Sequence, residues 1–172
     1  IESSPSSRRR FLKFAGLSLL LSGCGREVEK MASIQSVTRI EAGDECRLCG
    51  MSISNFPGPK GQLYERGYTQ NMKFCSTRDM FAYLLDPEHT HNIQSAFVHD
   101  MAISPWDHPD EETYIDARKA WYVVGSRLKG AMGPTLGSFA DQSSAQQFAD
   151  NNGGQLYQFD DLTLELISGM GF

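Results

Sequence analysis

Between residues 76 and 87 the apolar positions recur at the spacing of one helix face. Ser76 can act as the N-cap, and Asp79 follows three residues later, as in a capping box. Pro87 ends the pattern, because proline cannot continue a helix. The apolar stripe consists of Met80, Phe81, Leu84 and Leu85. The pattern predicts a short amphipathic helix.

A second helix is predicted by the same signals farther along the chain. A serine at 143 or 144 can cap it, a glutamine at 146 or 147 can reciprocate, and the glycines at 153–154 end it. Its inward-facing residues are Ala145, Phe148 and Ala149. The two helices therefore begin and end at similar sequence signals.

Strand-like segments flank each helix. Residues 93–101 alternate after the first helix, with Ile93, Phe97 and Met101 on one face, and residues 155–159 follow the second. Two more strands are expected before each helix, over 51–54 and 62–66 in the first half and over 120–125 and 129–132 in the second. The order strand, strand, helix, strand occurs twice.

This repeat predicts an α+β fold of two similar strand-strand-helix-strand modules. The polar stretch 104–113 separates a first module over 43–103 from a second over 113–168. Each module has only about 60 residues, too few to bury a large core alone. We therefore expect the two modules to pack together.

The N-terminal segment has the pattern of an export signal. Arginines at 8–10 and Lys13 precede the apolar residues 14–21, and Ser-Arg-Arg-x-Phe-Leu-Lys resembles a twin-arginine signal. A membrane-spanning helix needs about 20 apolar residues, so that interpretation is the weaker one. We expect export to the periplasmic face of a membrane.

The sequence Leu-Ser-Gly-Cys that ends at Cys24 resembles the lipobox of bacterial lipoproteins. On this interpretation residues 1–23 are the signal peptide, the Cys24 thiol carries a lipid, and residues 24–42 form the lipidated N-terminus and a tether to the folded part. The alternative is a free cysteine beside a conventional cleavage site.

Charge excludes one class of partner. The net charge is −5, and removal of residues 1–23 would leave it at about −8. Nucleic-acid binders carry a basic surface, so nucleic acid is not an expected partner. The membrane would be reached through the lipid on Cys24, because an acidic domain is repelled by anionic lipids.

Candidate chemistry concentrates at the Cys-x-x-Cys motif of Cys46 and Cys49, which Gly50 and Met51 follow. A thioether beside two thiols suits Cu(I), which prefers polarizable sulfur. A structural zinc site would need Cys75 and a histidine as further ligands. Gly50 stands where c-type haem attachment requires histidine. A thioredoxin-like redox motif and a plain structural disulfide are further alternatives.

Several motifs in a fixed order resemble the NosL family. They are Cys-x-x-Cys-Gly-Met after a lipoprotein signal, Phe-Val-His-Asp ending at Asp100, Tyr-Ile-Asp-Ala at 114–117 before the aromatic strand at 120–125, Met-Gly-Pro-Thr-Leu at 132–136, and the closing Phe-Ala with Gly-Gly. The resemblance extends over about residues 45–165.

The resemblance implies a copper-binding lipoprotein that accompanies nitrous oxide reductase in denitrification. Such a protein binds one Cu(I) and, with a membrane transporter complex, passes it toward the copper centres of that enzyme. The implied fold is two strand-strand-helix-strand modules akin to organomercurial lyase. The implied ligands are Cys49, Met51 and Met132, with Cys46 ranked below them because one thiolate and two thioethers already satisfy Cu(I).

Other classes of function stay open beside this copper carrier, which is not an enzyme. A thiol-based enzyme could perform disulfide exchange or lyase-like metal–carbon cleavage, and a zinc-binding lipoprotein would use the cysteines structurally. Cys75 is interpreted as a small buried apolar residue, and His99 as either a core histidine or a fourth ligand.

Overall fold

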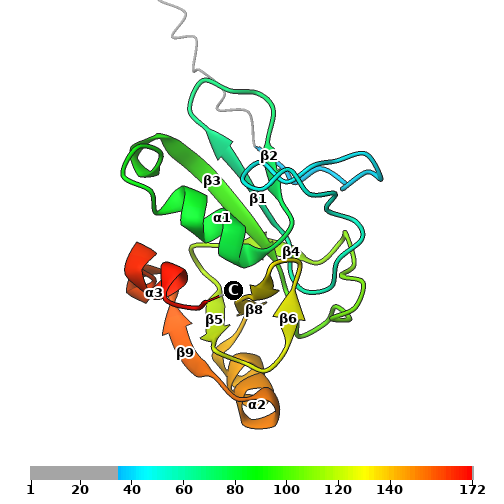
Figure 1. Cartoon of the computed structure of the whole chain (residues 1–172), viewed down its shortest axis with the longest axis vertical. Coiled ribbons are helices and arrows are strands. Elements are labelled where there is room, and N and C mark those ends of the chain that lie inside the picture. The colour runs from blue at the N-terminus through cyan, green and yellow to red at the C-terminus, as the bar shows by residue number, and fades with distance from the viewer. Residues whose placement is uncertain (1–34, 172) are drawn as a thin grey trace, which may run out of the picture. The chain divides into compact units, whose positions relative to one another are not determined.

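The computed structural model describes residues 35–171 (Figure 1). The predicted signal peptide 1–23, Cys24 and residues 25–34 lie outside the described residues. Among residues 35–171, no helix combines the length and apolar character needed to cross a membrane.

The first half contains a four-stranded antiparallel sheet. Its strand order is β2 (Met72–Phe74), β1 (Gly61–Glu65), β3 (Ile93–His99) and β4 (Tyr114–Asp116). Helix α1 (Thr77–Leu84) packs against β1 and β2, and the short 3-10 helix η1 (Thr90–Asn92) precedes β3 (Figure 1). Ser76 caps α1 as predicted, because its Oγ accepts a hydrogen bond of 3.1 Å from the Asp79 N–H.

The second half contains a three-stranded antiparallel sheet. Its order is β8 (Gly137–Phe139), β5 (Trp121–Val124) and β9 (Gln155–Gln158), and helix α2 (Gln142–Asn152) packs against all three strands. A small hairpin of β6 (Lys129–Gly130) and β7 (Gly133–Pro134) lies between β5 and β8 in the sequence. The chain continues through η2 (Phe159–Asp161) to α3 (Leu164–Ser168), which packs on α1 (Figure 1).

The two halves share a core through β5. Tyr122 and Val124 belong to the large apolar cluster that also contains Phe81 of α1, whereas Val123 belongs to a smaller cluster with Phe139. Successive strand residues point to opposite faces, so a strand that is apolar at every position is buried on both sides. Strand β5 contributes residues to both apolar clusters, and it therefore packs the two halves against each other, as expected.

The α+β class is confirmed, but several elements differ from those expected. Strand β4 lies in the segment assigned to the second module, yet it pairs with β3 in the first sheet. Residues 100–113 connect the two strands and bring the next extended segment back along the free edge of β3. The strand expected at 51–54 is reduced to an isolated bridge between Glu45 and Ser52. The cap of α2 is Asp141, whose ionised side chain accepts from the Ser144 N–H at 2.9 Å.

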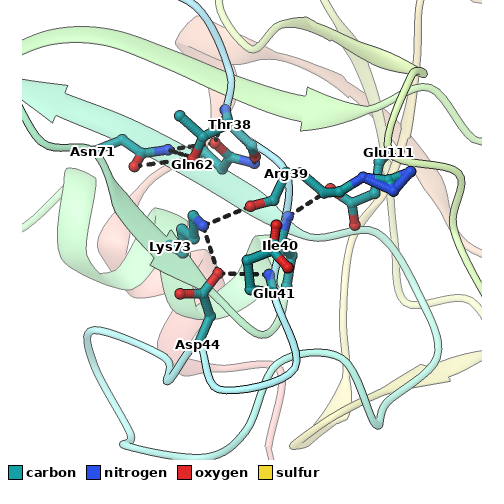
Figure 2. A network of polar contacts seen from close by, with 9 residues as sticks. All are labelled: Thr38, Arg39, Ile40, Glu41, Asp44, Gln62, Asn71, Lys73 and Glu111. Carbon is teal, nitrogen blue, oxygen red and sulfur yellow. Dashed lines mark hydrogen bonds and ion pairs between the residues drawn. The ribbon is translucent and has the colours of Figure 1, made fainter.

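Residues 35–42, which the sequence assigns to the tether, are hydrogen-bonded to the first sheet (Figure 2). The backbone of Thr38 exchanges two hydrogen bonds with the Gln62 side chain, at 3.0 and 2.7 Å. The Tyr64 hydroxyl donates to the Ser36 carbonyl at 2.7 Å. Because side chains of the sheet make these hydrogen bonds, residues 35–42 need no strand of their own. No alternation of apolar and polar positions in residues 35–42 therefore predicts them.

Candidate metal centre

The Cys-x-x-Cys motif lies at the tip of a short hairpin. Near its base, Ile53 N–H donates to the Asp44 carbonyl at 3.0 Å, and nearer the tip Cys46 N–H donates to the Met51 carbonyl at 2.8 Å. Gly50 has a φ of 71°, in the left-handed region that favours glycine, and it allows the turn to close. The turn therefore presents both thiols of the motif from one side of the hairpin.

The third thiol comes from the junction of β2 and α1. Cys75 follows the last residue of β2, and Asp79 lies in the first turn of α1. The Sγ atoms of Cys49 and Cys75 are 3.6 Å apart, and Asp79 Oδ2 lies 3.4 Å from Cys46 Sγ and 3.5 Å from Cys75 Sγ. All four ligand atoms lie within 4.8 Å of one another. We call Cys46, Cys49, Cys75 and Asp79 the thiol cluster.

The three thiols differ in acidity. The pKa of Cys46 is lowered to about 6, because the Cys75 thiol and nearby backbone N–H groups donate to its sulfur and outweigh the effect of burial. Burial raises the pKa of Cys49 to about 11. The pKa of Cys75 is raised by its hydrogen bond to Cys46, by burial and by the Asp79 carboxylate. Cys46 is therefore the most acidic thiol of the cluster.

The donor set of the thiol cluster suits a soft ion. Three sulfur atoms can ligate Cu(I) or Zn(II), and thiolates select these ions over hard cations such as Mg²⁺. The carboxylate of Asp79 is the hard member of the set, and its Oδ1 also accepts from the Ser76 hydroxyl at 3.4 Å. Cys46 and Cys75 are buried, whereas Cys49 is exposed. An ion could therefore enter and leave on the Cys49 side.

A pocket of about 320 Å³ opens beside Cys49 and connects the two halves of the chain. Asp79 of the thiol cluster lines it, together with Met132 from the turn between β6 and β7 and with Leu164 and Ile167 of α3. The fold thus brings the Met132 segment to the Cys49 side of the cluster. Ligation by Met132 stays a prediction.

The other candidate ligands have different surroundings. The Met51 backbone bonds Cys46 within the hairpin, and the role of its thioether stays a prediction. His99 is fully buried, its Nδ1 accepts from the Lys60 N–H at 2.9 Å, and it does not belong to the cluster formed by the described residues. The geometry favours the core interpretation of His99.

Sequence reasoning did not assign two members of the cluster to the copper site. Cys75 is buried as expected, but its sulfur faces Cys49 rather than serving only as packing. Asp79 entered the sequence analysis only as a capping residue. The one available signal was their position, since a cysteine directly before an N-cap and an aspartate three residues after that cap lie on neighbouring turns.

Comparison with known proteins then decides the family. The model of the NosL family matches residues 37–167, which include the whole thiol cluster and Met132. The chain belongs to the NosL family. Its NosL relatives include the copper-binding lipoprotein NosL of Stutzerimonas stutzeri, which is 42% identical over 151 residues, covering 88% of this chain and 78% of the relative.

Two further NosL proteins are similar to the chain. The copper-binding lipoprotein NosL of Achromobacter cycloclastes is 35% identical over 164 residues, covering 94% of this chain and 83% of the relative. The crystal structure of the copper chaperone NosL from Shewanella denitrificans matches with a TM-score of 0.74 and 49% identity, covering 75% of this chain and 96% of that one. These relatives are named as copper-binding proteins or a chaperone, which fits a non-enzymatic role.

Proposed function

We propose that this NosL family member binds one Cu(I) at the thiol cluster and delivers it for assembly of the copper centres of nitrous oxide reductase. The observation that carries the proposal is the convergence of three thiols from two separate segments of the chain. Sulfur ligands and low coordination numbers suit Cu(I). The names of the relatives support copper as the metal.

The proposed ligands fall into a strong and a weak group. The thiols of Cys46, Cys49 and Cys75 hold the ion, and one thioether, from Met51 or Met132, is the exchangeable fourth ligand. Cys49 is the exposed thiol, and Met132 lines the pocket beside it. A partner that offers better ligands could approach from this pocket and replace one ligand at a time.

A titration of the reduced full chain with Cu(I), in competition with a chelator, tests the proposal. We expect one ion per chain and much weaker binding of Zn(II). Met132→Ala should lower the affinity by about one to two decades, at roughly 1.4 kcal/mol per decade, whereas Cys49→Ser should nearly abolish binding. Equal losses from the two substitutions would contradict the division into strong and weak ligands.

Zinc is the second candidate, because three cysteines and one carboxylate also match a closed four-ligand site. Tight stoichiometric zinc uptake, with copper bound no more strongly, would favour a structural metal. A thiol-based enzyme would instead leave the cysteines unligated and catalyse exchange of added disulfides.

We also propose that the lipid on Cys24 anchors the protein at the periplasmic face of the membrane, after export by a twin-arginine-type signal. Its partners there would be the membrane transporter complex of the assembly system and nitrous oxide reductase. Cys24→Ser should release the protein from membranes without loss of copper affinity. Full membrane retention would show another anchor, and a large loss of affinity would make Cys24 a ligand.

A further inference from the structure

Lys73 of β2 joins residues 35–42 to the cysteine hairpin (Figure 2). Its ammonium group donates to the Arg39 carbonyl at 2.7 Å and pairs with Asp44 Oδ2 at 2.5 Å. Its backbone carbonyl accepts from the Arg47 N–H at 2.9 Å. One residue of β2 is therefore bonded to residues 35–42, to the base of the cysteine hairpin and to its tip.

The contacts of Lys73 fix the hairpin relative to the third thiol. Asp44 is the residue whose carbonyl pairs with Ile53 near the base of the hairpin, and Arg47 lies between the two cysteines of the motif. Cys75 follows Lys73 by two residues along β2 and its end. The same residue therefore bonds the hairpin and belongs to the strand that leads to Cys75, so it links the two parts of the thiol cluster.

The ion pair of Lys73 and Asp44 is partly shielded from solvent. The Lys73 side chain is 13% exposed and that of Asp44 is 30% exposed, whereas Lys119 in its surface pair with Asp116 is 85% exposed. Exposed ion pairs contribute little to stability, whereas shielded ion pairs with additional hydrogen bonds hold their geometry better. Asp44 Oδ2 also accepts from the Glu41 N–H at 2.8 Å, so the pair is part of a network.

We propose that Lys73, through Asp44, is a positioning residue of the metal site: it keeps the hairpin of Cys46 and Cys49 closed on Cys75 and thereby sets how long a bound copper ion is retained. This rests on the proposed copper-binding function. The docking of residues 35–42 on Lys73 extends the same network to the segment that leads toward the predicted lipid anchor.

The test compares Lys73→Met, which keeps the length of the apolar stem, with the matched control Lys119→Met, which removes an exposed ammonium. In the copper-free full chain, amide hydrogen exchange of Cys46, Arg47 and Ile53 should be at least about tenfold faster in Lys73→Met, since their N–H bonds hold the hairpin. Amides of β1 should be unchanged, and Lys119→Met should match the wild-type chain throughout.

The copper measurements use the same variants. Release of Cu(I) to excess chelator should be about tenfold faster in Lys73→Met than in Lys119→Met. Asp44→Asn should act like Lys73→Met, and the double variant should lose less than the sum of the two single variants, because both remove the same ion pair. Additive effects, or hairpin exchange equal to that of the control, would overturn the inference. Failure of the wild-type chain to bind Cu(I) would instead refute the proposed function, while the exchange result would still report on the hairpin.

Discussion

His99, the last residue of β3, provides a pH-dependent test of the buried interior of the first half. Its ring is fully buried, Nδ1 accepts from the Lys60 N–H, and Nε2 has no hydrogen-bond partner among the described residues. A neutral histidine with Nδ1 as acceptor carries its proton on Nε2. Protonation of Nδ1 would break the bond to Lys60 and place a second buried positive charge near its ammonium group.

The direction of the effect follows from the pKa of His99. Burial, and then the charge of Lys60, lower this pKa to about 3 from an ordinary value of 6.5. As the pH falls below 6.5, the unfolded chain takes up a proton that the folded chain refuses until about pH 3. The free energy of unfolding therefore falls with a slope of up to about 1.4 kcal/mol per pH unit. Between pH 7.5 and 5.0 the loss should be about 2 kcal/mol.

The assay is urea unfolding of the reduced, copper-free full chain between pH 7.5 and 5.0, followed by tryptophan fluorescence. His99→Asn keeps an acceptor for Lys60 but cannot take up the proton. We expect this variant to be less stable at pH 7.5, because it loses the ring contact with Tyr114. Between pH 7.5 and 5.0, however, its free energy of unfolding should fall by about 2 kcal/mol less than that of the wild-type chain. His108→Asn, at an exposed position, is the control that should follow the wild-type curve. Parallel curves for His99→Asn and the wild-type chain would refute the reasoning.

Two further predictions concern the thiols and the packing of α1. Oxidation of the copper-free chain by glutathione disulfide, which is reduced to two glutathione molecules, should join Cys49 to Cys75, because their sulfurs are 3.6 Å apart. The resulting disulfide should abolish Cu(I) binding. Peptide mapping that finds the disulfide within the Cys-x-x-Cys motif instead would contradict this prediction. Gly61→Ala should destabilise the fold by about 1–3 kcal/mol, because the new Cβ would lie 2.5 Å from Met80 Sδ, whereas Gly43→Ala meets nothing within 4 Å and should leave the unfolding midpoint unchanged.

Local signals in the sequence were sufficient for local structure. Ser76 caps α1 as predicted, because an N-cap bond joins residues only three apart and needs no information from the rest of the chain. The apolar spacing that follows it predicts the buried face, and Phe81 and Leu84 lie in the core. The family resemblance, which rests on several short motifs in order, also came from the sequence and was confirmed by the family match.

Only the tertiary structure could assemble the thiol cluster. Cys49 and Cys75 are separated by 26 residues, and their proximity depends on how the hairpin packs beside β2 and α1. Asp79 would be read from the sequence as a capping residue in any helix, and the fold alone gives it two sulfur neighbours. Lys73 gives no motif at all, because its three partners are backbone and side-chain groups of distant segments. Sequence patterns record the period of a helix or strand, whereas contacts between segments depend on which faces the packed chain buries together.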